Sequence, residues 1–181
     1  NGRALVETKR GPFLYLSKLE SYLEARLWNR IFEWTERQLK LPLGCIKATV
    51  LIENISAAFQ MHEILYELKS HSSGLNCGIW DYSASIISVF RHSKDFILPN
   101  RSEFVSIQCD FIKTYMLLLI ETCHRRQAPA TTGIDAINKK AVITQVQTNK
   151  GNLINVIPGA LILKTVAMIL IAPMIEEIPR K

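Results

Sequence analysis

The sequence lacks the features that mark several large classes of protein. Its 22 Lys and Arg residues never form a block longer than two, although the net charge is +6. A nucleic-acid partner is therefore not indicated, whereas a phosphorylated small molecule is compatible with the charge. The four cysteines contain no C-x-x-C pair, so neither a zinc site nor a disulfide framework is indicated, and we expect reduced thiols.

Targeting and membrane signals are also weak. Residues 1–10 are polar, contain no signal-peptide apolar run and lack an initiator Met, which fits a start inside a longer product. The apolar run at 159–175 covers 17 residues and includes Lys164 and Pro173, whereas a membrane span needs about 20. We expect a buried strand–helix piece or non-native read-through sequence there, and no membrane partner.

Familiar catalytic motifs are missing. The chain has no phosphate-binding glycine loop and no nucleophile elbow. His62 and His71 have no partner at metal-ligand spacing. The basic cluster at 123–127, CHRRQ, is better explained as stabilising a helix C-terminus than as a phosphate site.

The sequence does contain a regular alternation of strand and helix patterns in a chain with 48% hydrophobic residues. Predicted strands lie at 11–16, 45–53, 75–82 and 104–109. A helix follows each one. The first is predicted from a capping box of Ser17 and Glu20 and an apolar stripe. That stripe contains Leu19, Leu23, Leu27, Ile31 and Trp34. Helices are also predicted at 56–71, 84–93 and 111–127.

This order predicts an α/β fold with a parallel sheet and right-handed crossovers. Cys45, Cys77 and Cys109 recur 32 residues apart, close to the repeat of roughly 31 residues in a (β/α)₈ barrel of about 250 residues. The residues leave two alternatives open, an open sheet or an incomplete (β/α)₈ barrel of about four βα units.

Two carboxylates follow predicted strands. Glu53 ends KATVLIE and Asp81 ends LNCGIWD, 28 residues later. Ligands of parallel α/β folds bind at the carboxyl ends of the strands, and Mg²⁺ takes one or two protein carboxylates. The pair is therefore a candidate magnesium site. In the alternative interpretation, Glu53 caps the next helix and Asp81 is simply solvated.

Backbone groups beside Asp81 form a second candidate feature. Gly78 permits a close approach of the chain to a ligand, and successive N–H groups could bind an anion. Equally, Gly74 and Gly78 could serve only a turn and tight packing against Trp80.

Three segments together resemble the A-type malate synthases of the glyoxylate cycle. They are GPFLYLSKLESYLEARLWNRIF, IKATVLIENISAAFQMHEILYELKSHSSGLNCGIWDY and LLIETCHRR, within residues 11–133. The resemblance implies a (β/α)₈ barrel that condenses acetyl-CoA with glyoxylate to malate and CoA. It implies Mg²⁺ on Glu53 and Asp81, and glyoxylate on the backbone amides of Gly78, Ile79, Trp80 and Asp81.

The chain departs from the family pattern at the same motif. The family's GRWDY is GIWDY here, so Ile79 replaces an Arg, and Thr132 replaces a glycine downstream. The family's substrate Arg and catalytic Asp fall outside the matched segment, so no catalytic residue is identified. The alternative to an active malate synthase is a catalytically inactive, truncated remnant.

We expect three regions: a lead-in at 1–10, a partial barrel domain at 11–140 and an unmatched apolar tail at 141–181. The resemblance implies the cytoplasm or a peroxisome-type (glyoxysomal) organelle. The sequence makes no prediction of oligomeric state.

Overall fold

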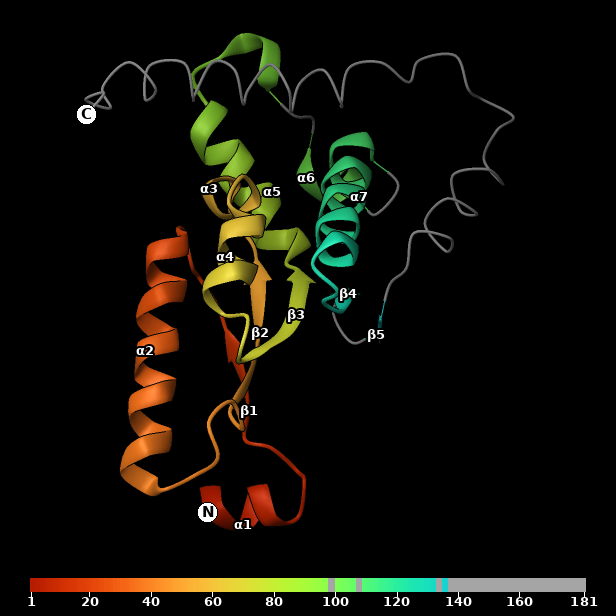
Figure 1. Ribbon diagram of the computed structural model, residues 1–181. Coiled ribbons are helices and arrows are strands. Elements are labelled where there is room, and N and C mark those ends of the chain that lie inside the picture. The colour runs from red at the N-terminus through yellow and green to blue at the C-terminus, as the bar shows by residue number, and fades with distance from the viewer. Residues whose placement is uncertain (98–99, 107–108, 133–134, 137–181) are drawn as a thin grey trace, which may run out of the picture.

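The computed structural model describes residues 1–97, 100–106, 109–132 and 135–136, which fold around one mostly parallel sheet (Figure 1). The strands are β1 (Phe13–Leu16), β2 (Lys47–Ile52), β3 (Ser72–Cys77), β4 (Ala130–Thr132) and β5 (Asp135–Ala136). The helices are α1 (Gly2–Glu7), α2 (Tyr22–Leu39), α3 (Ile55–Ala58), α4 (Met61–Glu67), α5 (Ile79–Phe90), the 3₁₀ turn η1 (Lys94–Phe96), α6 (Arg101–Phe104) and α7 (Asp110–Arg125).

The strands lie side by side in chain order. β1, β2, β3 and β4 pair in parallel, and β5 pairs antiparallel with β4. Helices connect the parallel strands, as such connections require. The predicted α/β class and the partial barrel of about four parallel strands are confirmed.

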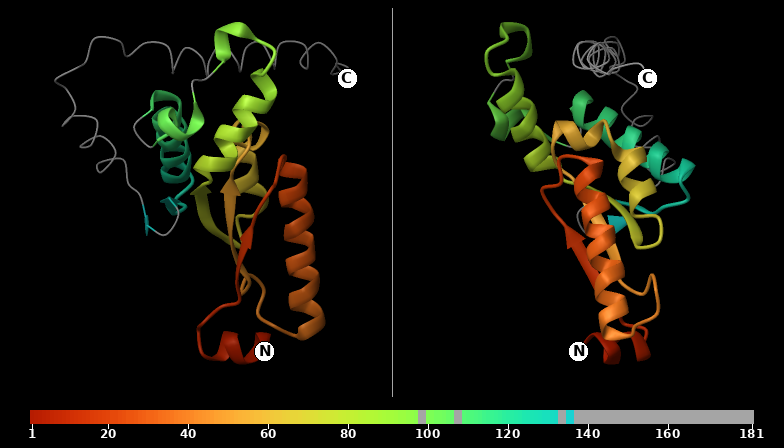
Figure 2. Two further views of the ribbon diagram at one scale, coloured as in Figure 1. Left: turned by 180° about the vertical axis from the view of Figure 1, so that it is seen from behind. Right: turned by 60° about the vertical axis from the view of Figure 1, so that its left-hand side comes forward.

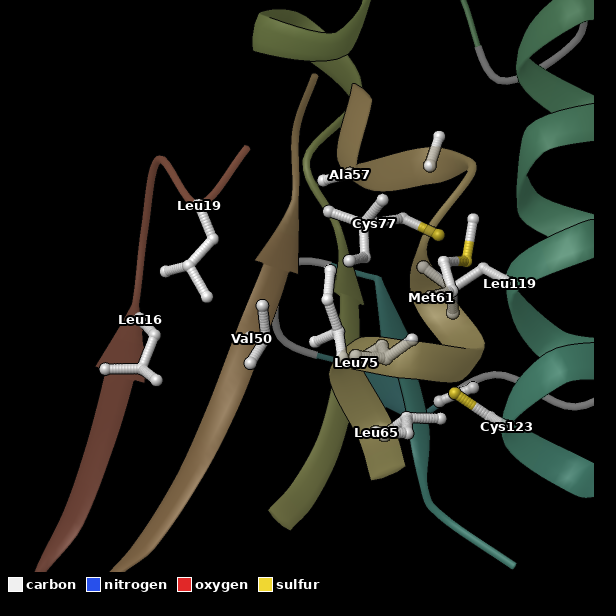
Figure 3. Packing of buried hydrophobic residues seen from close by; sticks show 14 of the residues in the cluster. Leu16, Leu19, Val50, Ala57, Met61, Leu65, Leu75, Cys77, Leu119 and Cys123 are labelled. Atoms are coloured by element: carbon white, nitrogen blue, oxygen red, sulfur yellow. The ribbon is translucent and has the colours of Figure 1, made fainter. Parts of the chain in front are cut away.

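The hydrophobic core lies between the sheet and its helices (Figure 3). Along β2 burial alternates, with Ala48, Val50 and Ile52 fully buried and the residues between them half-exposed. Leu75 of β3 packs in the same layer with Leu119 and Cys123 of α7. Burying a side chain of the size of Leu or Ile contributes about 1.5–3 kcal/mol, so this layer supplies much of the stabilising free energy.

A buried carboxylate joins α2 to the start of the sheet. Glu36 is fully buried. Its oxygens accept hydrogen bonds from the amides of Gly44 (2.8 Å) and Ile46 (2.9 Å), and one lies 3.3 Å from His71 Nε2. The other ring nitrogen of His71 contacts Asn29 Oδ1 at 2.8 Å. These contacts satisfy a charge that would otherwise be costly to bury.

The predicted stripe on the first helix is wrong apart from Leu19, which is buried but precedes α2. Leu23, Leu27 and Trp34 are more than half exposed, whereas the buried positions of α2 are Ala25, Phe32 and Glu36. Hydrophobic periodicity selected the outward face because the inward face includes a carboxylate that hydrogen bonds satisfy. The capping box also lies one turn later than predicted, at Ser21 and Glu24.

The strand predicted at 104–109 is wrong where the structure describes it. Phe104 ends α6, a helix that Asn100 caps by accepting a hydrogen bond from Ser102 N, and neither Val105 nor Ser106 is in a strand. Residues 107–108 lie outside the described residues. The fourth parallel strand is β4, which follows α7 rather than preceding it. A short apolar run cannot by itself distinguish a strand from a buried loop.

Two other predicted elements are shifted. The strand predicted at 75–82 ends at Cys77, because α5 begins at Ile79. The helix predicted at 56–71 is divided into α3 and α4, whereas the one at 111–127 is present as α7. Gly74, at φ +107°, allows β3 to approach β4, since an added Cβ would lie 2.1 Å from Pro129 O.

The four cysteines are free thiols, and Cys77 and Cys123 are buried, consistent with the prediction. Burial raises the pKa of Cys77 to about 12. In the described part of the chain, no helix combines the length and apolar character needed to cross a bilayer. The predicted tail at 141–181 lies outside the described residues.

We expect Glu36→Ala to lower the free energy of unfolding by about 2–4 kcal/mol, because the amides of Gly44 and Ile46 and the ring of His71 lose their partner. Urea unfolding monitored by circular dichroism measures the change. Glu121→Ala is the control, since the exposed Glu121–Arg125 pair on α7 should cost less than about 1 kcal/mol. Equal losses in the two variants would contradict the role of Glu36.

The same carboxylate predicts a pH effect. Burial opposes ionisation of Glu36, but the hydrogen bonds from Ile46, Gly44 and His71 outweigh it and hold the pKa below its ordinary value of 4.5. The resulting stability is present above pH 4.5 and is lost as pH falls through the lower folded-state pKa. The free energy of unfolding should therefore depend less steeply on pH below 4.5 in Glu36→Ala.

Candidate metal and anion site

The carboxyl ends of β2 and β3 meet at one edge of the sheet. Ile52 lies opposite Cys77 in the parallel register, which places Glu53 beside Gly78. A Cβ added to Gly78 would lie 2.5 Å from Glu53 Cβ, closer than real Cβ contacts allow. Glycine is therefore required at 78 for this approach of the two strand ends.

Glu53 is almost completely buried, at 4% exposure, and points to the turn that follows β1. Its Oε1 accepts a hydrogen bond from the backbone amide of Lys18 at 2.5 Å. It does not cap the next helix, because Asn54 caps α3 by accepting from Ala57 N at 2.8 Å. The interpretation of Glu53 as a helix cap is thus wrong.

Asp81 lies in the first turn of α5 with its side chain 53% exposed. The Lys18 ammonium lies 2.5 Å from Asp81 Oδ2 and 3.6 Å from Glu53 Oε2. This contact holds the pKa of Asp81 below its ordinary value and raises the pKa of Lys18. The two predicted carboxylates therefore converge on one cationic group.

The start of α5 supplies backbone amides at the same edge. Ile79, Trp80 and Asp81 are its first three residues, and the first amides of a helix have no acceptor within the helix. Together with the helix dipole they favour an anion. The amide of Gly78 is engaged differently, since it donates to Ile52 O (3.2 Å) and to Tyr115 Oη (3.1 Å).

The side chains of this turn divide between core and solvent. Ile79 packs against the hydrophobic core, whereas Trp80 is 64% exposed. The alternative in which Gly74 and Gly78 serve packing against Trp80 therefore lacks support, because most of that indole faces solvent.

Tyr115 of α7 contacts the carboxyl ends of β2 and β3. Its buried hydroxyl donates to Ile52 O, accepts from Gly78 N, and its ring stacks on Tyr82 at 4.0 Å between centroids. Burial raises the pKa of Tyr115, which keeps the hydroxyl protonated. Tyr115 thus fixes the backbone on both sides of the Glu53–Gly78 contact.

The residues present suit a hard divalent cation. Where the structure is described, no three His, Cys, Asp or Glu side chains gather as a metal-binding group. Mg²⁺ needs only one or two protein carboxylates and takes water or substrate oxygens for the rest. The Lys18 ammonium, held by Glu53 and Asp81, shows that this pair accommodates a cation.

Sequence reasoning missed Lys18 and Tyr115. Lys18 stands two residues after β1, a position that could have marked it as a strand-end residue. Its left-handed backbone, φ +61°, is not readable from a Ser-Lys-Leu sequence. Tyr115 lies within the helix predicted at 111–127, where it could not be distinguished from an ordinary core residue.

Comparison with known proteins decides the family. A family model described as malate synthase, TIM barrel domain, matches residues 1–156 of the 181. The chain belongs to the malate synthase family. The match extends beyond the predicted domain limits of 11 and 140, which stay predictions.

Two malate synthases illustrate how much of the family is covered. The Streptomyces clavuligerus protein is 52% identical over 135 residues, which are 74% of this chain and 25% of that protein. The glyoxysomal malate synthase of Glycine max is 51% identical over 126 residues, 70% of this chain and 22% of that protein. The chain thus spans about a quarter of the length of the curated relatives it matches.

A solved malate synthase has the same fold. The Haloferax volcanii enzyme, in a pyruvate/acetyl-CoA ternary complex, superposes with a TM-score of 0.52 at 13% identity. The superposition covers 66% of this chain and 30% of that structure.

We expect Gly78→Ala to destabilise the chain by about 1–3 kcal/mol, because the new methyl group would push Glu53 away from the sheet edge. Urea unfolding measures the loss. Gly2→Ala in α1 is the control, where the added Cβ has only one ordinary contact at 3.7 Å and alanine favours the helix. A neutral Gly78→Ala would show that the two strand ends are not in close contact.

Proposed function

We propose that the chain carries the metal- and glyoxylate-binding part of a malate synthase, the enzyme that condenses acetyl-CoA with glyoxylate to malate and CoA. The observation that supports this proposal is the convergence of Glu53 and Asp81 on one cation, beside the N-terminus of α5. Membership in the malate synthase family supplies the reaction.

Each part of the site has a proposed task. Glu53 and Asp81 would hold Mg²⁺, with Glu53 kept in place by the amide of Lys18. When bound there, Mg²⁺ would supply Lewis-acid polarisation of the aldehyde oxygen of glyoxylate. The amides at the start of α5 would orient the glyoxylate carboxylate through hydrogen bonds and the helix dipole.

The relatives support proposals for the substrates and for the compartment. The Haloferax volcanii malate synthase binds acetyl-CoA and pyruvate, a 2-oxo acid as glyoxylate is, and we infer acetyl-CoA and glyoxylate as the substrates here. The glyoxysomal name of the Glycine max relative supports a peroxisome-type organelle, and the cytoplasm is the alternative.

A second candidate is a binding-only remnant of the same site. Ile79 packs against the core where the family motif has Arg, so a guanidinium is missing next to the anion-binding amides. The resemblance also places the family's substrate Arg and catalytic Asp outside the matched segment. A site that binds metal and glyoxylate but does not turn over would fit these departures.

We expect the 181-residue chain to bind Mn²⁺, used as a probe for Mg²⁺, at this site. Glu53→Gln and Asp81→Asn should each weaken binding at least about tenfold, since each removes one of only two protein ligands. Electron paramagnetic resonance of free Mn²⁺ measures the affinity. Asp110→Asn is the control, because Asp110 is also exposed in the first turn of a helix. Equal affinity in all variants would place the metal elsewhere.

Turnover separates the two candidates. We expect the 181-residue chain by itself to release no CoA thiol from acetyl-CoA with glyoxylate and Mg²⁺. Loss of a general base and an electrostatic clamp costs many powers of ten in rate. Turnover that disappears in Asp81→Asn would instead show an active enzyme.

A further inference from the structure

Lys18 occupies the position at which the two carboxylates converge. Its ammonium contacts Glu53 Oε2 at 3.6 Å and Asp81 Oδ2 at 2.5 Å. One ammonium neutralises only half of the charge of two carboxylates. The Lys18 ammonium therefore neutralises the pair only in part while it gives the buried carboxylate, Glu53, a cationic partner, and the charge of Arg101 also acts on Asp81.

The backbone and the side chain of Lys18 are held separately. The Lys18 amide donates to Glu53 Oε1, whereas the ammonium contacts the other oxygen, Oε2. The side chain is 66% exposed, and a four-carbon stem gives it freedom to swing into solvent. The ammonium can leave without disturbing the amide that holds Glu53 in place.

We propose that Lys18 is a built-in placeholder for the metal, whose ammonium competes with the divalent cation for Glu53 Oε2 and Asp81 Oδ2. This inference rests on the proposed function, because it requires the metal to bind at that pair. It assigns Lys18 a competing role: without metal its ammonium partly neutralises the two carboxylates, and it is displaced when a doubly charged ion arrives.

Competition between the ammonium and the metal predicts the direction in which metal affinity changes when Lys18 is replaced. Removing the ammonium takes away a rival cation and a repulsive charge, so the remaining carboxylates should attract a divalent ion more strongly. A purely structural role would have the opposite sign, because loss of Lys18 would disorder the carboxylates and weaken metal binding. The direction of the change therefore distinguishes the two roles.

The test is Mn²⁺ affinity, by electron paramagnetic resonance, of the 181-residue chain and its Lys18→Met variant. We expect Mn²⁺ to bind the variant about two- to fivefold more tightly, the range for one solvent-exposed ion pair. Lys18→Arg retains a positive charge and should stay close to the unsubstituted chain. Lys40→Met is the matched control, since Lys40 also has a left-handed backbone (φ +51°) and lies outside this site.

Thermal unfolding gives a second measurement on the same proteins. Without metal, Lys18→Met removes the cationic partner of Glu53 and leaves only the amide hydrogen bond, so its Tm should fall below that of Lys40→Met. At the same saturating Mn²⁺ concentration, the Tm of Lys18→Met should rise by more than that of the unsubstituted chain, because the stabilisation grows with the logarithm of the ratio of ligand concentration to Kd.

Each result is decisive for one of the two proposals. Unchanged or weaker Mn²⁺ binding in Lys18→Met, with binding in the unsubstituted chain intact, overturns the placeholder role and leaves the proposed function standing. Absence of Mn²⁺ binding in every protein overturns both. Binding that appears only in Lys18→Met supports the placeholder role in its strongest form.

Discussion

The close approach of β2 and β3 at their carboxyl ends is the constraint on which the rest of the site depends. Parallel pairing in register sets Glu53 beside Gly78, and the absence of a Cβ at 78 allows the two strand ends to touch. Tyr115 then joins both strand ends through one buried hydroxyl. Directly after this contact α5 begins at Ile79, and its first turn places Asp81 beside the Lys18 ammonium that also contacts Glu53.

The charged groups at this edge determine which kinds of ligand it favours. The edge holds two carboxylates, one ammonium and the positive end of a helix dipole within a few side chains. A pair of neighbouring carboxylates favours a divalent cation, and the first amides of α5 favour an anion next to it. A metal and a small carboxylate are therefore complementary to adjacent parts of one edge, which suits a 2-oxo acid.

The fold and the two carboxylates were predictable because strand–helix alternation and the position of Glu53 and Asp81 after apolar runs are properties of the sequence itself. The inward face of α2 was not, because Glu36 is buried by hydrogen bonds from distant residues, Gly44 and Ile46. The role of Lys18 could not be predicted either, because its place between the carboxylates depends on a left-handed turn and on the pairing of β1 with β2. Such long-range partners have no periodic signal.

Residue 79 bears differently on family membership and on the proposed activity. Family membership rests on long matched segments, whereas Ile79 buries an apolar side chain where the family motif has a cation. The backbone amides survive that exchange because they depend on α5 and not on the side chain. We therefore expect the proposed binding to be less sensitive than turnover to the exchange at residue 79.

A crystal structure of the chain soaked in Mn²⁺ would test the central claim most directly, because anomalous scattering locates manganese without ambiguity. We predict one Mn²⁺ bound by carboxylate oxygens of Glu53 and Asp81, with the Lys18 ammonium turned away into solvent. Manganese at another position, or a Lys18 ammonium still bridging the two carboxylates in a saturated crystal, would contradict it.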